Sequence, residues 1–367
     1  MARALTVLHI DTERGWRGGE RQVFWLARAM LAAGHRPLVA ARVGEPLAIR
    51  ARTKGLEVVD CRPRGELDLR AAWRLRGVVS RMEVDVVHAH TAHAVTLGAL
   101  ALLGSSVPLV ASRRVDFPLR RGPTSRWKYR RAARIIAVSS AVRRILVSGG
   151  IEESVIDVVP DGTDVHRRAE PASRDTLRQL GVPAGAPLVV QVAQLVSHKD
   201  PVNFVRAMRV VVDAIPSAHG LLVGEGPLRS AATAEVKTLG LEGHVHFGGF
   251  RDDADALLAS ADVACLSSRE EGMGSVLLDS MVFGRPVAAT TAGGIPEVVR
   301  DGETGLLAPP ESPKALGEAL VRLLKDADLR RRMAAAGKER AGEFSVERMA
   351  ERTVAIYEEV ILSAARP

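Results

Sequence analysis

Two acidic residues with seven positions between them form the pattern with the clearest chemical meaning. Glu271 and Asp279 lie on either side of a predicted helix start near Ser275. Glycines before that start permit close approach of the backbone to a ligand, and the first helical amides can bind a phosphate or a sugar hydroxyl. We predict a site for a sugar, a phosphate or both. The residues that follow Glu271 are Gly272, Met273, Gly274, Ser275 and Val276.

Two other segments place polar groups directly after predicted strands. Gln194 and Lys199 follow one strand, and Gly224 and Gly226 form a strand-to-helix turn after the next. A lysine can offset the charge of a phosphate, and a glutamine can donate hydrogen bonds to it. On its own, Lys199 is equally well read as a surface lysine, and the two glycines as a tight turn.

Together these segments resemble the group 1 glycosyltransferases, a retaining family of the GT-B fold whose motif is Glu, seven residues, then a second Glu. The resemblance implies that Glu271 contacts hydroxyls of the donor sugar, and that Asp279, shorter than the family's Glu, faces the ribose. It implies that Gln194 and Lys199 bind the diphosphate, Gln194 standing where the family has Arg. Donor-binding roles are also implied for Gly18, Gly19, Gly224, Gly226, Met273, Gly274, Ser275 and Val276.

A histidine cluster follows the fourth predicted strand. His88, His90 and His93 invite a metal interpretation, but a zinc site would need an acid or thiol nearby. The family often has His-x-His at this point, and the resemblance implies that His90 contacts the reaction centre. We therefore predict catalytic roles for His90 and Glu271, with neither a metal nor another cofactor.

These residues must be positioned by two α/β domains. Short apolar runs at 5–10, 37–42, 56–61, 84–90, 109–112, 134–139 and 155–160 read as buried parallel strands, and the pattern restarts at 188–195, 220–223, 245–247, 263–267 and 286–290. We expect Rossmann-like doubly wound domains at 1–170 and 171–345, facing across a cleft, and a helix at 346–367 that returns to the first domain. Gly15, Gly18 and Gly19 do not fit the dinucleotide fingerprint.

Basic residues are concentrated in the first half of the chain. Residues 1–170 hold 29 Lys and Arg against 17 Asp and Glu, densest between Arg113 and Arg134. No nucleic-acid fold is recognisable, so nucleic acid is not expected as a partner. A solvated helix face is one interpretation; the preferred one is a surface for anionic lipid or a charged acceptor. Its predicted residues are Arg120, Arg121, Arg130 and Arg131.

Composition places the chain among soluble globular proteins. Cys61 and Cys265 lie in apolar runs and are expected as buried thiols, and the longest apolar span is too short to cross a bilayer. A cytoplasmic location is expected, either free or peripheral on the inner face of the cytoplasmic membrane.

The predicted activity is transfer of a hexose or related sugar from a nucleoside diphosphate carrier to a glycan or glycolipid, in cell-surface polysaccharide or lipopolysaccharide synthesis. A nucleotide-sugar epimerase of the same architecture would bind the same donor but turn it over without an acceptor. A non-catalytic binding protein would show no turnover at all.

Overall fold

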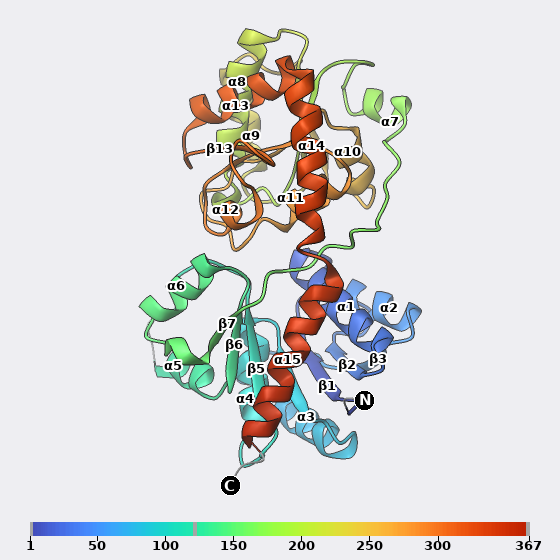
Figure 1. Ribbon diagram of the computed structural model, residues 1–367, viewed down its shortest axis with the longest axis vertical. Coiled ribbons are helices and arrows are strands. Elements are labelled where there is room, and N and C mark those ends of the chain that lie inside the picture. Colours follow the sequence, from blue (N-terminus) through green and yellow to red (C-terminus); the bar gives the residue numbers. More distant parts are fainter. Residues whose placement is uncertain (1–2, 120–122, 365–367) are drawn as a thin grey trace. The chain divides into compact units, whose positions relative to one another are not determined.

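A computed structural model describes residues 3–119 and 123–364 of the chain, which form two compact α/β units (Figure 1). The first comprises Met1–Gly162 and Val346–Pro367, and the second comprises Thr163–Ser345. Residues 163–170, assigned to the first domain from the sequence, therefore belong to the second compact unit, while the C-terminal helix belongs to the first.

The first unit is built on a parallel sheet of seven strands in the order β3-β2-β1-β4-β5-β6-β7. The strands are β1 (Thr6–Ile10), β2 (Arg36–Ala41), β3 (Glu57–Asp60), β4 (Val86–Ala89), β5 (Leu109–Arg113), β6 (Arg134–Ala137) and β7 (Ile156–Val158). The helices are α1 (Gly18–Ala32), α2 (Pro46–Thr53), α3 (Leu69–Arg81), α4 (Ala92–Ala101), α5 (Pro123–Arg130), α6 (Ser140–Ser148), the 3-10 turn η1 (Glu153–Val155) and α15 (Val346–Ala364).

The last helix, α15, packs against α1, the first helix of the same unit. Its apolar residues recur at helical spacing, and Met349, Ile356, Tyr357 and Val360 are buried in the same core as Val23 of α1. The stripe that predicted a returning helix is thus buried against the first domain.

The second unit has a parallel sheet of six strands in the order β10-β9-β8-β11-β12-β13. The strands are β8 (Leu188–Val192), β9 (His219–Val223), β10 (Val245–Gly249), β11 (Val263–Leu266), β12 (Val287–Thr290) and β13 (Gly305–Ala308). The helical elements are α7 (Arg174–Gln179), η2 (Ser197–Lys199), α8 (Pro201–Ala214), α9 (Arg229–Thr238), α10 (Ala254–Ser260), α11 (Ser275–Val282), α12 (Ile295–Val298), α13 (Pro313–Lys325) and α14 (Ala327–Gly342).

Both sheets are doubly wound, which confirms the predicted fold class. Strand order reverses between β1 and β4 in the first sheet, and between β8 and β11 in the second. Ligands of open parallel sheets bind beyond the carboxyl ends of the strands at such reversals. The segments that follow these four strands are therefore where functional side chains should be sought.

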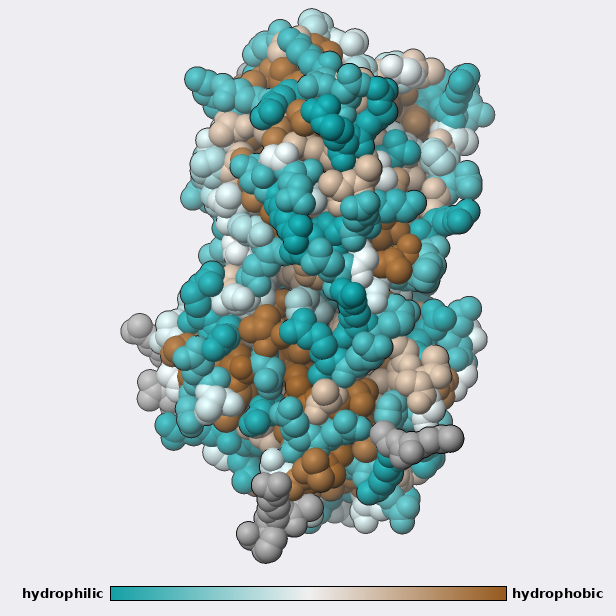
Figure 2. Space-filling view, in the orientation of Figure 1, coloured by the Kyte–Doolittle hydropathy of each residue, from teal (hydrophilic) through white to brown (hydrophobic). Residues whose placement is uncertain are grey.

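The surface of both units is largely hydrophilic on the face seen in Figure 2, where hydrophobic residues form separate patches. Cys61 and Cys265 are free and buried, as expected. Among the described residues, no helix combines the length and apolar content that spanning a bilayer requires.

Candidate functional site

The strand reversal of the second unit carries a partly buried ion pair. Lys199 ends η2, which follows β8, and its Nζ donates to Oε2 of Glu271, which follows β11. The same carboxylate oxygen accepts a hydrogen bond from Ser268 Oγ at 3.2 Å, and Glu271 is only 9% exposed. The structure thus brings together two residues that sequence analysis assigned to the sugar and the diphosphate.

The loop that carries Lys199 is tied to the end of β11. Ser267 Oγ donates to the carbonyl oxygens of Lys199 and Asp200 at 3.0 and 2.8 Å, and Arg269 pairs with the Asp200 carboxylate at 2.6 Å. Asp200 has a positive φ of 46° and caps α8 through the Asn203 amide. These bonds hold the backbone of the loop from which the Lys199 side chain extends.

Helix α11 begins directly after this pair. Gly274 is its N-cap residue, with a φ of 83° that favours glycine, and the Glu271 carbonyl accepts a 2.9 Å hydrogen bond from the Gly294 amide. The amides of Ser275 and Val276 stand at the first two helical positions, where no intrahelical acceptor is available. Met273, two residues before the helix, is also buried. The helix start can therefore supply donors to an anion next to Lys199.

Asp279 already has partners within its own unit. Its Oδ1 accepts from Thr163 Oγ1 at 3.1 Å and lies 2.7 Å from Nη2 of Arg167, and the residue is 2% exposed. Arg167 also lies over the Phe283 ring. The shorter acid thus ties α11 to the segment that enters the second unit, and a ribose contact would have to share this carboxylate with Arg167.

Gly224 and Gly226 allow two loops to approach each other. A Cβ at Gly224 would lie 2.0 Å from the Ala193 carbonyl oxygen, and one at Gly226 would lie 2.4 Å from the Leu195 carbonyl oxygen. Backbone hydrogen bonds join the loops, from Leu195 N to Glu225 O and from Leu228 N to Leu195 O. The glycines therefore support the backbone around Gln194, whose side chain is exposed.

A network of three buried histidines marks the strand reversal of the first unit. His9 of β1 is in register with His88 of β4, so the two imidazoles share a face with His90, two positions further on. His9 Nδ1 lies 3.0 Å from His90 Nε2, and Arg114 donates to His90 Nδ1 at 3.3 Å. His88 hydrogen-bonds to Tyr357 and Ser112. His93, in contrast, is exposed on α4.

The histidine network is neutral because burial penalises the imidazolium form. Burial, and then the Arg114 charge, lowers the pKa of His9 to about 3. Burial and neighbouring charges hold the pKa of His88 and of His90 well below the ordinary value. Since His90 Nδ1 accepts from Arg114, its proton resides on Nε2 and is donated to His9. His90 is thus presented as a fixed, neutral polar group.

Because His9 is buried in its neutral form, we predict that the free energy of unfolding depends on pH. Unfolded His9 titrates near 6.5 and folded His9 near 3, so between these values the unfolded chain binds the additional proton, and stability falls as pH decreases. Each pH unit costs about 1.4 kcal/mol per such histidine. From pH 6.5 to 4.5 we expect wild type to lose about 2 kcal/mol more than His9→Asn, which retains an acceptor for His90.

Tryptophan fluorescence measures this difference, because Trp16, Trp25, Trp73 and Trp127 all belong to the first unit. Burial raises the pKa of Asp11 to about 7, so Asp11 makes the free energy of unfolding rise as the pH decreases. This contribution is the same in wild type and His9→Asn, and it cancels from the difference between them. Equal pH slopes for wild type and His9→Asn would contradict the prediction.

The same three imidazoles are the one group of metal-ligand type within the described residues, with ring nitrogens within 4.8 Å of one another. Both nitrogens of His88 are already bonded to hydroxyls, and the Arg114 guanidinium lies against His90. A cation would have to break these bonds beside a fixed positive charge. The geometry favours a hydrogen-bond network over a metal centre.

The glycine loop of the first unit opens helix α1. Gly18 and Gly19 are its first residues, and the Arg17 amide donates to Glu20 Oε2 at 2.6 Å, which is one of the two bonds of a capping box. A Cβ on Gly19 would meet nothing within 4 Å. The loop therefore has open space beside its backbone, as a ligand-covering loop requires.

Much of the basic stretch between Arg113 and Arg134 is used inside the unit. Arg114 pairs with Asp161 at 2.9 Å, and Lys128 pairs with Glu66 at 2.6 Å. Of the four arginines predicted to form a surface, Arg120 and Arg121 lie outside the described residues. The other two are exposed and line a hollow of about 230 Å³ beside the loop before β5; they are Arg130 and Arg131.

Three residues of the first site were missed from the sequence: Arg114, Asp161 and Tyr357. Arg114 and Asp161 follow β5 and β7, so their place at the carboxyl ends of predicted strands was an available signal. Tyr357 lies 269 positions from His88 and had no local signal beyond its place in a helical stripe.

Two family models match the chain, one over each half. The model described as Glycosyltransferase Family 4 matches residues 16–167, and that described as Glycosyl transferases group 1 matches residues 173–340. A 2-deoxystreptamine glucosyltransferase of Streptomyces kanamyceticus is 32% identical over 78% of this chain and 74% of its own. A phosphatidyl-myo-inositol mannosyltransferase of Mycobacterium leprae is 31% identical over 77% and 76%.

Solved structures match in fold across nearly the whole chain. Anabaena HepE in complex with UDP-glucose has a TM-score of 0.84 at 23% identity, covering 97% of this chain and all of its own. Sucrose-phosphate synthase from Thermosynechococcus elongatus has a TM-score of 0.80 at 22% identity, covering 98% and 100%. These likenesses confirm the predicted GT-B architecture.

Proposed function

The chain belongs to the group 1 glycosyltransferases of family 4, and from this premise we propose that it transfers a hexose or related sugar from a nucleoside diphosphate sugar to a glycan or glycolipid. The observation that carries the proposal is the Lys199 and Glu271 pair beside the start of α11. One group suits a diphosphate and the other suits sugar hydroxyls, and they are held adjacent by the fold.

The proposed mechanism stabilises the departing diphosphate with fixed groups of this chain. Negative charge grows on the leaving group as the sugar becomes oxocarbenium-like. Lys199 and the amides of Ser275 and Val276 would oppose that charge, together with Gln194 and the loop at Gly18 and Gly19. Preorganised donors of this kind need no reorganisation during the reaction. On this basis we propose a reaction that does not require a divalent cation.

Glu271 is proposed to bind the sugar through its hydroxyls once the donor has displaced part of the Lys199 contact. His90 is proposed to contact the sugar at the reaction centre as a neutral group: Arg114 holds its Nδ1 as an acceptor, and its Nε2–H would donate to a sugar hydroxyl in place of His9. The family resemblance favours retention of the anomeric configuration.

The donor is tested by calorimetry with UDP, GDP, ADP and their sugar conjugates, each with and without EDTA. We expect one nucleotide to bind equally well in both conditions, and UDP is first to be tried because the HepE structures contain it. Binding that is abolished by EDTA would contradict the metal-independent mechanism. Absence of binding by every nucleotide would contradict the proposed donor site.

The acceptor is proposed to be a cell-surface glycan or glycolipid. Relatives include a lipopolysaccharide core glycosyltransferase of Rhizobium meliloti, 34% identical over 46% of this chain. Nuclear magnetic resonance of the product would read the anomeric configuration, and inversion would overturn the proposed retention. Named relatives are transferases, so the epimerase and non-catalytic alternatives are not favoured.

A further inference from the structure

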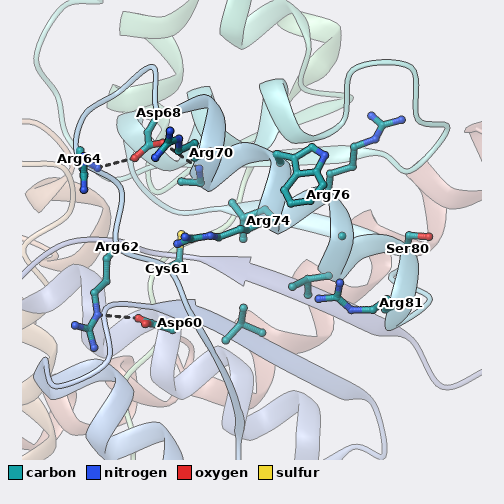
Figure 3. A pocket seen from close by; sticks show the side chains of 16 residues that line it. Asp60, Cys61, Arg62, Arg64, Asp68, Arg70, Arg74, Arg76, Ser80 and Arg81 are labelled. Carbon is teal, nitrogen blue, oxygen red and sulfur yellow. Dashed lines mark hydrogen bonds and ion pairs between the residues drawn. The ribbon is translucent and has the colours of Figure 1, made fainter.

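A hollow of about 750 Å³ in the first unit lies outside the candidate site. It is formed by the edge strand β3, the segment that follows this strand, and helix α3 (Figure 3). The sheet side is lined by Val59, Asp60 and Cys61. None of the residues assigned to donor binding or catalysis lines this hollow, so the proposed reaction gives it no role.

Strand β3 has one free edge. It is the outermost strand of its sheet, and among the described strands it pairs only with β2. The Cys61 amide donates to the Ala41 carbonyl oxygen of β2 at 2.9 Å. Since alternate residues of a parallel strand bond to the same neighbour, the amides and carbonyls of Val58 and Asp60 face away from β2. These backbone groups are a template for one additional strand.

An added strand would direct side chains into the hollow. Side chains along a strand alternate between the two faces of the sheet. Val58 packs against the apolar core on one face, whereas Val59 and Cys61 line the hollow on the other. A strand that continued the sheet beyond β3 would therefore place every second side chain on the hollow's face, toward the wall formed by α3.

The wall formed by α3 is basic. Arg70, Arg74 and Arg81 line the hollow, and none of the three forms an ion pair with another described residue. Figure 3 shows Arg74 extending toward Cys61. Arg70 and Arg74 are separated by about 6 Å along the helix axis, close to the roughly 7 Å between neighbouring side chains on one face of a strand. Acidic side chains at alternate positions of an added strand could meet successive arginines.

The acids near this edge are each bound within the unit, which reduces their repulsion of an acidic segment. Glu57 accepts two hydrogen bonds from Arg36, at 2.8 and 3.1 Å, and Asp60 pairs with Arg62 at 3.0 Å. Asp68 accepts a backbone amide as the N-cap of α3. The guanidinium groups of the α3 wall therefore remain available to acids of a partner, and they stay charged at any physiological pH.

An exposed tryptophan adds an apolar contact beside these arginines. Trp73 lines the hollow and is 75% exposed, whereas another side of α3 is buried through Ala71, Leu75 and other apolar residues. Trp73 lies three residues after Arg70 and is therefore its neighbour on the helix surface. Tryptophan and arginine are the side chains that most often dominate binding energy in protein interfaces.

We propose that the free edge of β3 and the hollow beside α3 bind an extended acidic segment of a partner protein, which adds as a strand to the first sheet. Backbone groups of β3 pair with the segment, Arg70 and Arg74 pair with its acidic side chains, and Trp73 contacts its apolar ones. A small phosphate could contact the arginines, but it has no backbone to pair with β3. This inference goes beyond the proposed reaction and does not depend on the donor.

Fluorescence polarisation of the full-length protein with labelled synthetic peptides tests the proposal. The probe is a peptide of about eight residues that alternates glutamate with valine, and its matched control is N-methylated on alternate amides, which keeps the charge but blocks pairing along one edge. We expect the unmodified peptide to bind and the N-methylated peptide to bind roughly 10-fold more weakly, the loss of one or two hydrogen bonds. Equal binding of both peptides, or no binding by either, overturns the proposal.

Variants of the wall locate the binding. Arg70→Ser with Arg74→Ser should weaken binding of the acidic peptide roughly 10-fold, from two ion pairs at the surface. The lysine pair R70K and R74K should retain most of it. Arg130→Ser with Arg131→Ser removes the same charge from exposed positions of the same unit and should leave binding unchanged. Equal loss in the two serine variants overturns the proposal, because it would indicate attraction to the net charge alone.

Tryptophan emission supplies a second, local readout. Peptide binding should shift the emission of wild type to shorter wavelength, and Trp73→Phe should still bind but show no shift. A shift that persists in Trp73→Phe would place the peptide elsewhere and overturn the proposal. Displacement of bound peptide by equimolar inorganic pyrophosphate would overturn it in favour of a small anion.

Melting temperatures of all variants exclude unfolding as the cause of lost binding. Nucleotide binding, measured by calorimetry on the same samples, should be unchanged. Failure of the peptide surface and failure of the proposed donor site are therefore distinguishable.

Discussion

Replacing Lys199 by Ala is expected to lower kcat/KM by roughly 10²–10³-fold, the range typical for removal of one preorganised group that opposes developing negative charge. The loop that carries Lys199 is held by Ser267, which donates to the Lys199 carbonyl oxygen, and by Arg269, which pairs with Asp200. The measurement is initial velocity with the nucleotide sugar identified by calorimetry. Lys237→Ala on exposed α9 removes the same charge from the same unit and should leave kcat/KM unchanged.

The Lys199 variant must also be separated from a loss of folding. Removing the lysine leaves the Glu271 carboxylate buried without its cation, which destabilises the second unit. In the double variant with Glu271→Gln this cost should be relieved, whereas activity should not return, because the leaving group still lacks its cation. Recovery of activity together with stability would contradict both proposed roles, because the double variant lacks the diphosphate-binding cation and the sugar-binding carboxylate.

The positions of the strands were predicted from short apolar runs, because a strand that is buried on both faces consists almost entirely of apolar residues. The weakest case was β13, the four residues Gly305–Ala308, which is absent from the strands predicted from the sequence. It pairs with β12 at the outside of the sheet. An edge strand of this length has too short an apolar run to be distinguished from the residues that flank it.

Site residues that directly follow a strand could be predicted from the sequence. A site residue that reaches its partner only through the packing of a helix could not. Lys199 and Glu271 each lie at a carboxyl end, and the order of strands brings them into contact. Tyr357 reaches His88 only because α15 packs on the first unit. That contact depends on tertiary packing, for which one sequence carries little information.

The interpretation of Gly224 and Gly226 changed most between the sequence and the structure. A strand-to-helix turn with two glycines suggested close approach to a nucleotide. The space that a side chain would fill at Gly224 and Gly226 is instead occupied by the backbone of the neighbouring loop. Sequence indicates that something approaches a glycine closely, but only the fold identifies what approaches.

Substitution of Gly224 by Ala is therefore expected to destabilise the second unit by about 3–5 kcal/mol, from a strained backbone and an unavoidable overlap. Gly224 has a φ of 141°, and its Cβ would lie 2.0 Å from the Ala193 carbonyl oxygen. Displacing Ala193 also moves Gln194 and the start of the Lys199 loop. A loss of nucleotide affinity should therefore accompany the loss of stability.

The distribution of aromatic residues allows this effect to be assigned to one unit. Every tryptophan and tyrosine of the chain lies in the first unit, so fluorescence reports its unfolding, while far-UV circular dichroism reports both. Gly224→Ala should move the dichroism transition to lower denaturant and leave the fluorescence transition in place. Gly243→Ala, where a Cβ meets nothing within 4 Å, is the matched control and should move neither. If Gly224→Ala unfolded within about 0.5 kcal/mol of wild type, the range of ordinary surface changes, the two loops could not be packed as closely as the structure places them.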